Sequence, residues 1–460
     1  MGARPMQPMR ARLQRSWVAL LGAAVLLGGC SSAQPFRLQA VDELVQPDAP
    51  GFRGLEFLAD TVPGQLKPRV NIVYVHGIGW TEDPDIDALG QEFLDGLVET
   101  YGVEAQLDAR GKCLGVGQGP QAPNRDFLFV TAPEPIRLQT GLPGAYLTLD
   151  RLACMDRSAL EVDGSLDIVV YRIFWDDAFW NALQFAHIGQ DDGRGSSAAL
   201  AGLRRKYNRR LKDEIVNYGI SDAVMYLGPV GEIIREAVRG GICAAALDAG
   251  GVDFARQGID VAYDLACELE FNTTVEANQF AFVSESLGSK IVYDLLHDAL
   301  TDGRDGPLDT LVQGAELYML ANQLPLLFLS DLAREAEPER SPAAVAAERR
   351  PRIVAISEPN DLLTYELLPF LEQLWKRSEH VDARGFEDPA VREEIARRLG
   401  FDVVDLRVEF ADPLVPLVEG LVDPLQAHKE HAGEPEILRL LLCGLRAGRL
   451  REEGCLAAER

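Results

Sequence analysis

Residues 279–300 read QFAFVSESLGSKIVYDLLHDAL, which is an apolar run, a turn of small residues and a segment of helical periodicity. The apolar part, Gln279–Val283, predicts a buried strand, and Lys290–Leu300 predicts the helix that leaves it. Strands that pass directly into helices are the units from which parallel α/β sheets are built. This segment therefore indicates an α/β fold, and other strands should alternate with helices along the chain.

Other β-branched and apolar runs recur with helical patterns between them. Two of them, VNIVYV and LDIVVYRIF, are apolar nearly throughout, as in strands that are covered on both faces of a sheet. The predicted strands are Val70–Val75, Phe127–Val130, Leu166–Phe174, Ala315–Ala321, Arg352–Ile356 and Val403–Phe410, and a predicted helix spans Ile86–Tyr101. The alternation predicts a mostly parallel sheet flanked by helices.

The turn after Gln279–Val283 holds several serines, of which one fits a strained strand-to-helix turn. Such a turn exposes a serine hydroxyl and accepts only small residues two positions before and two positions after that serine. Ser286 meets this requirement, because Ser284 precedes it and Gly288 follows it at those offsets. Ser286 is therefore the candidate nucleophile. The alternative is that a serine here only caps the helix.

In this context S-x-S-x-G resembles the G-x-S-x-G motif of the α/β-hydrolase family, with Ser284 in place of the first glycine. His76-Gly77, which follows the strand VNIVYV, is similar to the turn that supplies one amide of that family's oxyanion hole. The resemblance implies that the backbone N–H groups of Ile78 and Leu287 stabilise a tetrahedral intermediate and that His76 is structural.

The resemblance also implies an acid after a later strand, because the family's chain order is nucleophile, acid, histidine. The strand RIVAI is followed by Ser357-Glu358-Pro359-Asn360-Asp361. We expect Asp361 to be this acid, since the Pro-Asn turn carries it past the end of the strand. Glu358 is the alternative acid, and Asp361 is also placed to cap the helix that follows.

Six histidines are present, and only three of them follow Asp361. His380 precedes the last predicted strand, whereas His428 and His431 follow it, which is where the family places its base. We choose His428, because Pro424 fixes the approach of its loop, and keep His431 as the alternative. A plain surface histidine is the non-catalytic interpretation of either residue.

The 209 residues between His76 and Ser286 exceed what the core strands and helices need. We expect a mostly helical cap insertion at about 179–267, within an α/β-hydrolase-like domain that spans 66–450. The apolar and aromatic residues of this insertion suit acyl substrates, but they are equally compatible with the insertion's own core. Residues 334–351 are charged and rich in Ala and Pro, which is typical of a surface excursion.

The N-terminus has the pattern of a bacterial lipoprotein signal at residues 1–29. Four arginines precede an uncharged run of 13 residues, Trp17–Gly29, which is short of the roughly 20 that cross a bilayer. Leu27-Gly28-Gly29-Cys30 resembles a lipobox, so we expect Cys30 to be acylated, with an ordinary cleaved signal or an uncleaved anchor as alternatives. Ser31 after the cysteine resembles the pattern sorted to the outer membrane. Residues 30–65 are then a tether and 451–460 a C-terminal tail.

The chain is strongly acidic, with 71 acidic and 45 basic residues and a formal net charge of −26. Loss of residues 1–29 removes four arginines and no acid, which leaves 41 basic side chains and a net charge of −30. Such a surface repels a phosphate backbone, so nucleic acid is excluded as a partner. We attribute the charge to solubility and not to a cation-binding surface, because no loop has calcium-site spacing.

Six cysteines besides Cys30 suit an oxidising compartment. None of their spacings is C-x-x-C, and their grouping favours the nearest-neighbour pairs, with free buried thiols as the alternative. The expected disulfides are Cys113–Cys154, Cys243–Cys267 and Cys443–Cys455.

Together these features predict a lipid-anchored serine hydrolase of the bacterial cell envelope that cleaves carboxylic esters through Ser286, Asp361 and His428. No metal or other cofactor is needed, and Asp176 and Asp177 lack a neighbouring histidine. The expected partners are an ester or acyl-lipid substrate and the membrane. A peptidase or amidase, a thioesterase, and a non-catalytic binding lipoprotein on the same scaffold are the alternatives. The sequence leaves the substrate, its chain length and the oligomeric state open.

Overall fold

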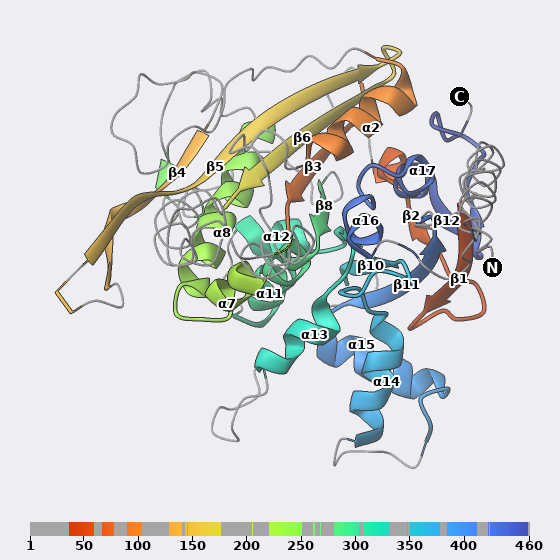
Figure 1. Cartoon of the computed structure of the whole chain (residues 1–460). Coiled ribbons are helices and arrows are strands. Elements are labelled where there is room, and N and C mark those ends of the chain that lie inside the picture. Colours follow the sequence, from red (N-terminus) through yellow and green to blue (C-terminus); the bar gives the residue numbers. More distant parts are fainter. Residues whose placement is uncertain are drawn as a thin grey trace, which may run out of the picture.

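The computed structural model is built around one large sheet (Figure 1). It describes residues 36–58, 67–77, 90–103, 128–139, 143–144, 146–175, 205, 220–250, 261–262, 267, 280–302, 307–331, 347, 350–377, 384–411, 422 and 424–458. The statements below concern these residues. Cys30 and the signal at 1–29 lie outside them, as do Ile78 and most of the predicted insertion.

The sheet has ten strands in the order β1-β11-β10-β9-β8-β3-β6-β5-β4-β7. The strands from β11 to β6 in this order run parallel to one another, and β4 runs parallel to β7. β1 is antiparallel to β11, and β5 is antiparallel to both β6 and β4. Their bounds are β1 (Arg37–Glu43), β3 (Arg69–Val75), β4 (Leu128–Gln139), β5 (Tyr146–Val162), β6 (Leu166–Phe174), β7 (Val261–Ala262), β8 (Phe280–Glu285), β9 (Glu316–Leu320), β10 (Arg352–Ser357) and β11 (Asp402–Glu409). The predicted mostly parallel α/β sheet flanked by helices is confirmed.

Helices cover both faces of the sheet, and each face has its own apolar core. Along β3, Ile72 and Tyr74 belong to one core while Val73 and Val75 belong to the other, as the alternation of a strand requires. One face carries α7 (Ser221–Tyr226), α8 (Gly231–Ala249), α11 (Leu287–Asp302), α12 (Pro307–Val312), α13 (Leu324–Leu327), η8 (Phe328–Asp331), α14 (Leu367–Arg377) and α15 (Pro389–Leu399). The other carries η2 (Leu55–Leu58), α2 (Gln91–Tyr101) and α17 (Pro435–Cys443).

The long hairpin strand β5 was not predicted from the sequence, because charged residues interrupt its apolar positions. Asp156 and Arg172 face each other across β5 and β6, and both are buried. Arg172 donates from Nε to Asp156 Oδ1 at 3.0 Å and forms a second bond to the other carboxylate oxygen. A buried charge that is paired in this way is compatible with a strand interior. The charged residues of this segment therefore do not indicate a loop.

The helix α8 comes from the segment 179–267 that we expected to form a cap. It packs directly against the sheet, and most of one side of it is buried in the same core as β3 and β5. This helix is therefore a layer of the core. The remaining described residues of the segment are few, so a cap over the site stays a prediction.

The folded body extends beyond the predicted bounds at both ends. Strand β1, from the expected tether, is the edge strand against β11. At the other end a small sheet forms from β2 (Phe52–Arg53), β12 (Gly444–Arg446) and β13 (Arg449–Leu450). Beyond it, the amides of Leu456 and Ala457 donate to the Glu56 carboxylate at 2.6 and 2.9 Å, and Tyr101 donates to the same group at 2.8 Å.

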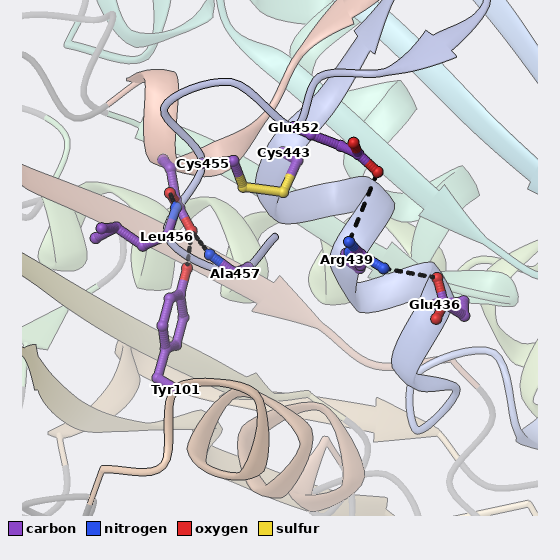
Figure 2. Close-up of a disulfide and its surroundings, with 9 residues drawn as sticks. Tyr101, Glu436, Arg439, Cys443, Glu452, Cys455, Leu456 and Ala457 are labelled. Atoms are coloured by element: carbon purple, nitrogen blue, oxygen red, sulfur yellow. Dashed lines mark hydrogen bonds and ion pairs between the residues drawn. A yellow bond between two sulfur atoms is a disulfide. The ribbon is translucent and has the colours of Figure 1, made fainter. Parts of the chain in front are cut away.

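Two of the predicted disulfides are present. Cys443–Cys455 joins the end of α17 to the C-terminal segment (Figure 2), and Cys243–Cys267 joins α8 to a residue 24 positions later. Cys154, in β5, is also disulfide-bonded, and its predicted partner Cys113 lies outside the described residues.

Candidate active site

Ser286 lies in the turn between β8 and α11, at the carboxyl edge of the parallel strands. It is buried and adopts a left-handed backbone with φ of 53°, which is unfavourable for a residue with a Cβ. Its amide donates to the carbonyl of Leu320, at the end of the neighbouring strand β9, at 2.9 Å. The packed neighbours therefore hold the serine in a conformation that it would not otherwise prefer.

Two glycines permit this turn, because other backbone passes against it. A Cβ on Gly288 would lie 2.4 Å from the Val75 carbonyl oxygen, and a Cβ on Gly77 would lie 2.5 Å from the Cβ of Ser286. Ser284 occupies the position two residues before Ser286, where the motif that this segment resembles has a glycine. Its side chain is buried and its hydroxyl donates to Ser289 Oγ at 3.3 Å.

His428 reaches Ser286 from α16 (Pro424–Lys429), which follows the last strand of the sheet. Its Nε2 lies 3.0 Å from Ser286 Oγ, and its Nδ1 lies 2.8 Å from Asp361 Oδ2. The imidazole side chain is 13% exposed and the Asp361 side chain is fully buried. Serine, imidazole and carboxylate thus form one continuous hydrogen-bonded chain.

Asp361 follows β10 and is fixed by its own turn. Its Oδ1 accepts from the amide of Leu363 at 2.8 Å, and its Oδ2 accepts from the Thr364 hydroxyl as well as from His428. Burial by itself raises the pKa of Asp361, but the hydrogen bond and charge of His428, with Thr364, bring that pKa below its ordinary value. The carboxylate is therefore ionised and can hold the imidazole in one tautomer.

The two alternative residues of the sequence analysis occupy structural positions. His431 is completely buried beside Phe410, and its Nδ1 lies 3.3 Å from the carbonyl oxygen of His428. Burial lowers the pKa of His431 to about 4, so the ring is neutral. Glu358 accepts from the Asn360 side chain at 2.8 Å and from the amide of Asp361 at 3.0 Å, which shapes the turn. The structure brings neither residue to Ser286.

Sequence reasoning missed Gln323, which is buried after β9 and donates from Nε2 to Ser286 Oγ at 2.8 Å. The preceding residue, Asn322, is also buried; its side chain donates to the carbonyl of Tyr365 at 2.8 Å and accepts from the amide of Leu324. A polar Asn-Gln pair directly after the predicted strand Ala315–Ala321 was the available signal, because that strand end lies at the same edge as Ser286.

The predicted oxyanion donors are only partly described. Leu287 is the first residue of α11, where helix amides have no carbonyl partner within the helix. Ile78 lies outside the described residues, but the chain before it is held firmly. The ring of His76 stacks on Trp175 with centroids 5.4 Å apart, and Trp175 Nε1 donates to the carbonyl of His76 at 3.1 Å. Trp175 thus holds both the ring and the backbone of His76.

One further carboxylate lies beside the serine. Glu285 accepts from the hydroxyl of Tyr74 at 2.6 Å. Burial raises the pKa of Glu285, while the bond from Tyr74 and the charge of His428 act in the opposite direction. The Glu285 carboxylate is hydrogen-bonded to Tyr74, whereas the Ser286 hydroxyl is hydrogen-bonded to His428 and Gln323.

Within the described ranges, no group of three or more His, Cys, Asp or Glu side chains is arranged to hold a metal ion. In the same ranges, no helix is both long and apolar enough to span a bilayer. Comparison of the chain with protein-family models, curated proteins and solved structures found no match.

Proposed function

We propose that this chain is a serine hydrolase that cleaves carboxylic esters through an acyl-enzyme intermediate. The observation that carries the proposal is the chain of hydrogen bonds from Ser286 Oγ to His428 Nε2 and from His428 Nδ1 to Asp361 Oδ2, at 3.0 and 2.8 Å. The left-handed turn at Ser286 supports it, since strain of this kind at a strand end is typical of functional residues.

The roles follow from the geometry. His428 Nε2 removes the proton from Ser286 Oγ, which bonds to the carbonyl carbon of the ester, and the protonated imidazole then gives this proton to the leaving alcohol. Asp361 keeps the Nδ1 proton in place and stabilises the imidazolium. In the second half, His428 activates water, and the acyl–Oγ bond breaks. The amides of Leu287 and Ile78 are the expected oxyanion donors, each contributing about 3–4 kcal/mol.

Several features favour an α/β-hydrolase scaffold for this chemistry. The serine follows β8, the acid follows β10 and the histidine follows β11, which is the family's chain order. Glycines at 77 and 288 lie where backbone segments meet the serine turn. We infer membership of this family from these features and from the motif S-x-S-x-G.

We further propose that the enzyme is an envelope lipoprotein acylated on Cys30. Strand β1 begins at Arg37, so the folded body would start only seven residues after the anchor. An extended chain of seven residues reaches about 25 Å. An enzyme held this close to a bilayer would meet lipid esters of the envelope, which we propose as its substrates.

The test is labelling of the mature protein with a fluorophosphonate probe, followed by hydrolysis of short and long acyl esters. Native protein should label, Ser286→Ala should not, and His428→Ala should label at least 10³-fold more slowly. His431→Ala should retain labelling, provided that the protein stays folded. A native protein that neither labels nor cleaves any ester, amide or thioester would refute the proposal in favour of a binding lipoprotein.

A further inference from the structure

The segment after β9 is strained in the same way as the serine turn. In the described part of the chain, the non-glycine residues with positive φ are Asp163, Ser286, Ala321 and Ala447. Asp163 and Ala447 lie in hairpin turns, which favour this conformation. Ser286 and Ala321 instead end the neighbouring parallel strands β8 and β9, where no hairpin requires it. Their strain therefore calls for a functional explanation.

The turn at Ala321 places the side chain of Gln323 next to Ser286. Asn322 is fully buried and ties this turn to the loop that carries Asp361, since its carbonyl accepts from the amide of Tyr365 and its side chain donates to the carbonyl of Tyr365. With Asn322 held in this way, the side-chain amide of Gln323 donates from Nε2 to Ser286 Oγ at 2.8 Å. The side chain of Gln323 makes no capping hydrogen bond to α13. The first amides of α13 donate instead to the backbone carbonyl of Gln323 and to the side-chain oxygen of Asn322.

We propose that Gln323 is a catalytic residue, a fixed hydrogen-bond donor to Ser286 Oγ that stabilises the negative charge this oxygen gains during acylation and deacylation. The proposal rests on the proposed function. In the resting site the Oγ–H group donates to His428, and the Gln323 amide occupies a lone pair of the same oxygen.

The charge on Oγ changes twice during turnover. As the proton passes to His428 Nε2, the electron pair of the O–H bond stays on Oγ and then forms the bond to the carbonyl carbon. In deacylation that bond breaks, the pair returns to Oγ, and His428 gives the proton back. An amide donor at 2.8 Å stabilises both transition states more than the neutral hydroxyl, because hydrogen bonds to charged groups are the stronger ones.

The experiment compares Gln323→Met and Gln323→Glu with native protein and with Gln39→Met, a surface control in which the exposed Gln39 amide donates to Glu409. The rate of fluorophosphonate labelling reports acylation, and ester turnover after the burst reports deacylation. Both rates should fall by about 10- to 100-fold in Gln323→Met, which corresponds to the loss of one bond to a charged oxygen. The surface control should match native protein.

The Gln323→Glu variant tests whether Gln323 acts as a hydrogen-bond donor or only packs against the serine. Glu is similar in shape to Gln, but an ionised carboxylate accepts a bond from the Ser286 hydroxyl, competes with His428 for it and opposes negative charge on Oγ. We expect the rising limb of the pH profile to move to higher pH in Gln323→Glu and its plateau to fall at least 10-fold. Thermal unfolding and circular dichroism establish that each variant is folded.

The outcomes distinguish this inference from the proposed function. Native protein that labels, with Gln323→Met and Gln323→Glu at native rates and with the native pH profile, overturns the role of Gln323 and leaves the serine hydrolase intact. Native protein that does not label overturns both. Slower labelling in both variants, with a displaced pH profile in Gln323→Glu, supports the role.

Discussion

His431 should make the protein less stable in mild acid, and its surroundings give the size of the effect. Its Nδ1 lies 3.3 Å from the carbonyl of His428, so that nitrogen carries the proton, and Nε2 is buried with no hydrogen-bond partner in the described chain. A second proton would place a charge beside the ring of Phe410. This burial lowers the pKa of His431 from 6.5 to about 4.

The direction of the pH dependence follows from that shift. A histidine whose pKa is depressed in the folded state contributes full stability above the unfolded pKa and loses it as the pH falls toward the folded pKa. The difference between 6.5 and about 4 amounts to about 3 kcal/mol at about 1.4 kcal/mol per pH unit, and most of it is lost by pH 4.5. This loss is a large part of the stability of a typical domain.

The assay is urea unfolding of native protein, His431→Asn and His431→Phe at pH 7.5 and pH 4.5. Between these pH values the free energy of unfolding of native protein should fall by about 2–3 kcal/mol more than that of either variant, because neither variant titrates there. Ionisable groups that do not interact with His431 contribute equally to all three proteins and cancel. Equal losses in native protein and both variants would refute the reasoning.

Three other substitutions have defined outcomes. Gly288→Ala should lower the free energy of unfolding by about 1–3 kcal/mol and slow fluorophosphonate labelling, because its Cβ meets the Val75 carbonyl oxygen; Gly385→Ala, with open space around it, is the matched control. Asp361→Asn should slow labelling by about 10³- to 10⁴-fold, and a loss below 10-fold would contradict its role. Replacement of Cys443 and Cys455 together by Ala should cost about 3 kcal/mol in urea unfolding, from the 12-residue separation that the disulfide closes, and an unchanged midpoint would contradict this.

Much of the fold and part of the site could be predicted because their signals are local. The apolar runs that form β3, β6 and β8 to β11 are short, continuous and followed by helical patterns, so strand positions and a mostly parallel sheet followed from periodicity. The offsets of Ser284 and Gly288 around Ser286 are likewise local, because steric limits on a tight turn act over a few residues. The chain order that the resemblance implies then restricted the proposed acid and the proposed base to a few residues each.

The remaining features depend on partners that are distant in the sequence. Asp156 lies within a strand only because Arg172 on the next strand pairs with it. The packing of α8 against the sheet depends on contacts with strands that are distant in the sequence, so the amphipathic pattern of α8 did not show which surface covers it.

The amino-acid sequence alone determined the strand–turn–helix unit at Ser286 and narrowed its partners to Asp361 or Glu358 and to His428 or His431. Only the tertiary structure selected among them, because His428 and His431 are three residues apart and differ in which way their rings face. One ring meets Ser286 and Asp361, and the other is buried against Phe410. The position of Gln323 beside Ser286 likewise depends on tertiary structure, since the alignment of β8 with β9 places the Gln323 side-chain amide next to the serine hydroxyl.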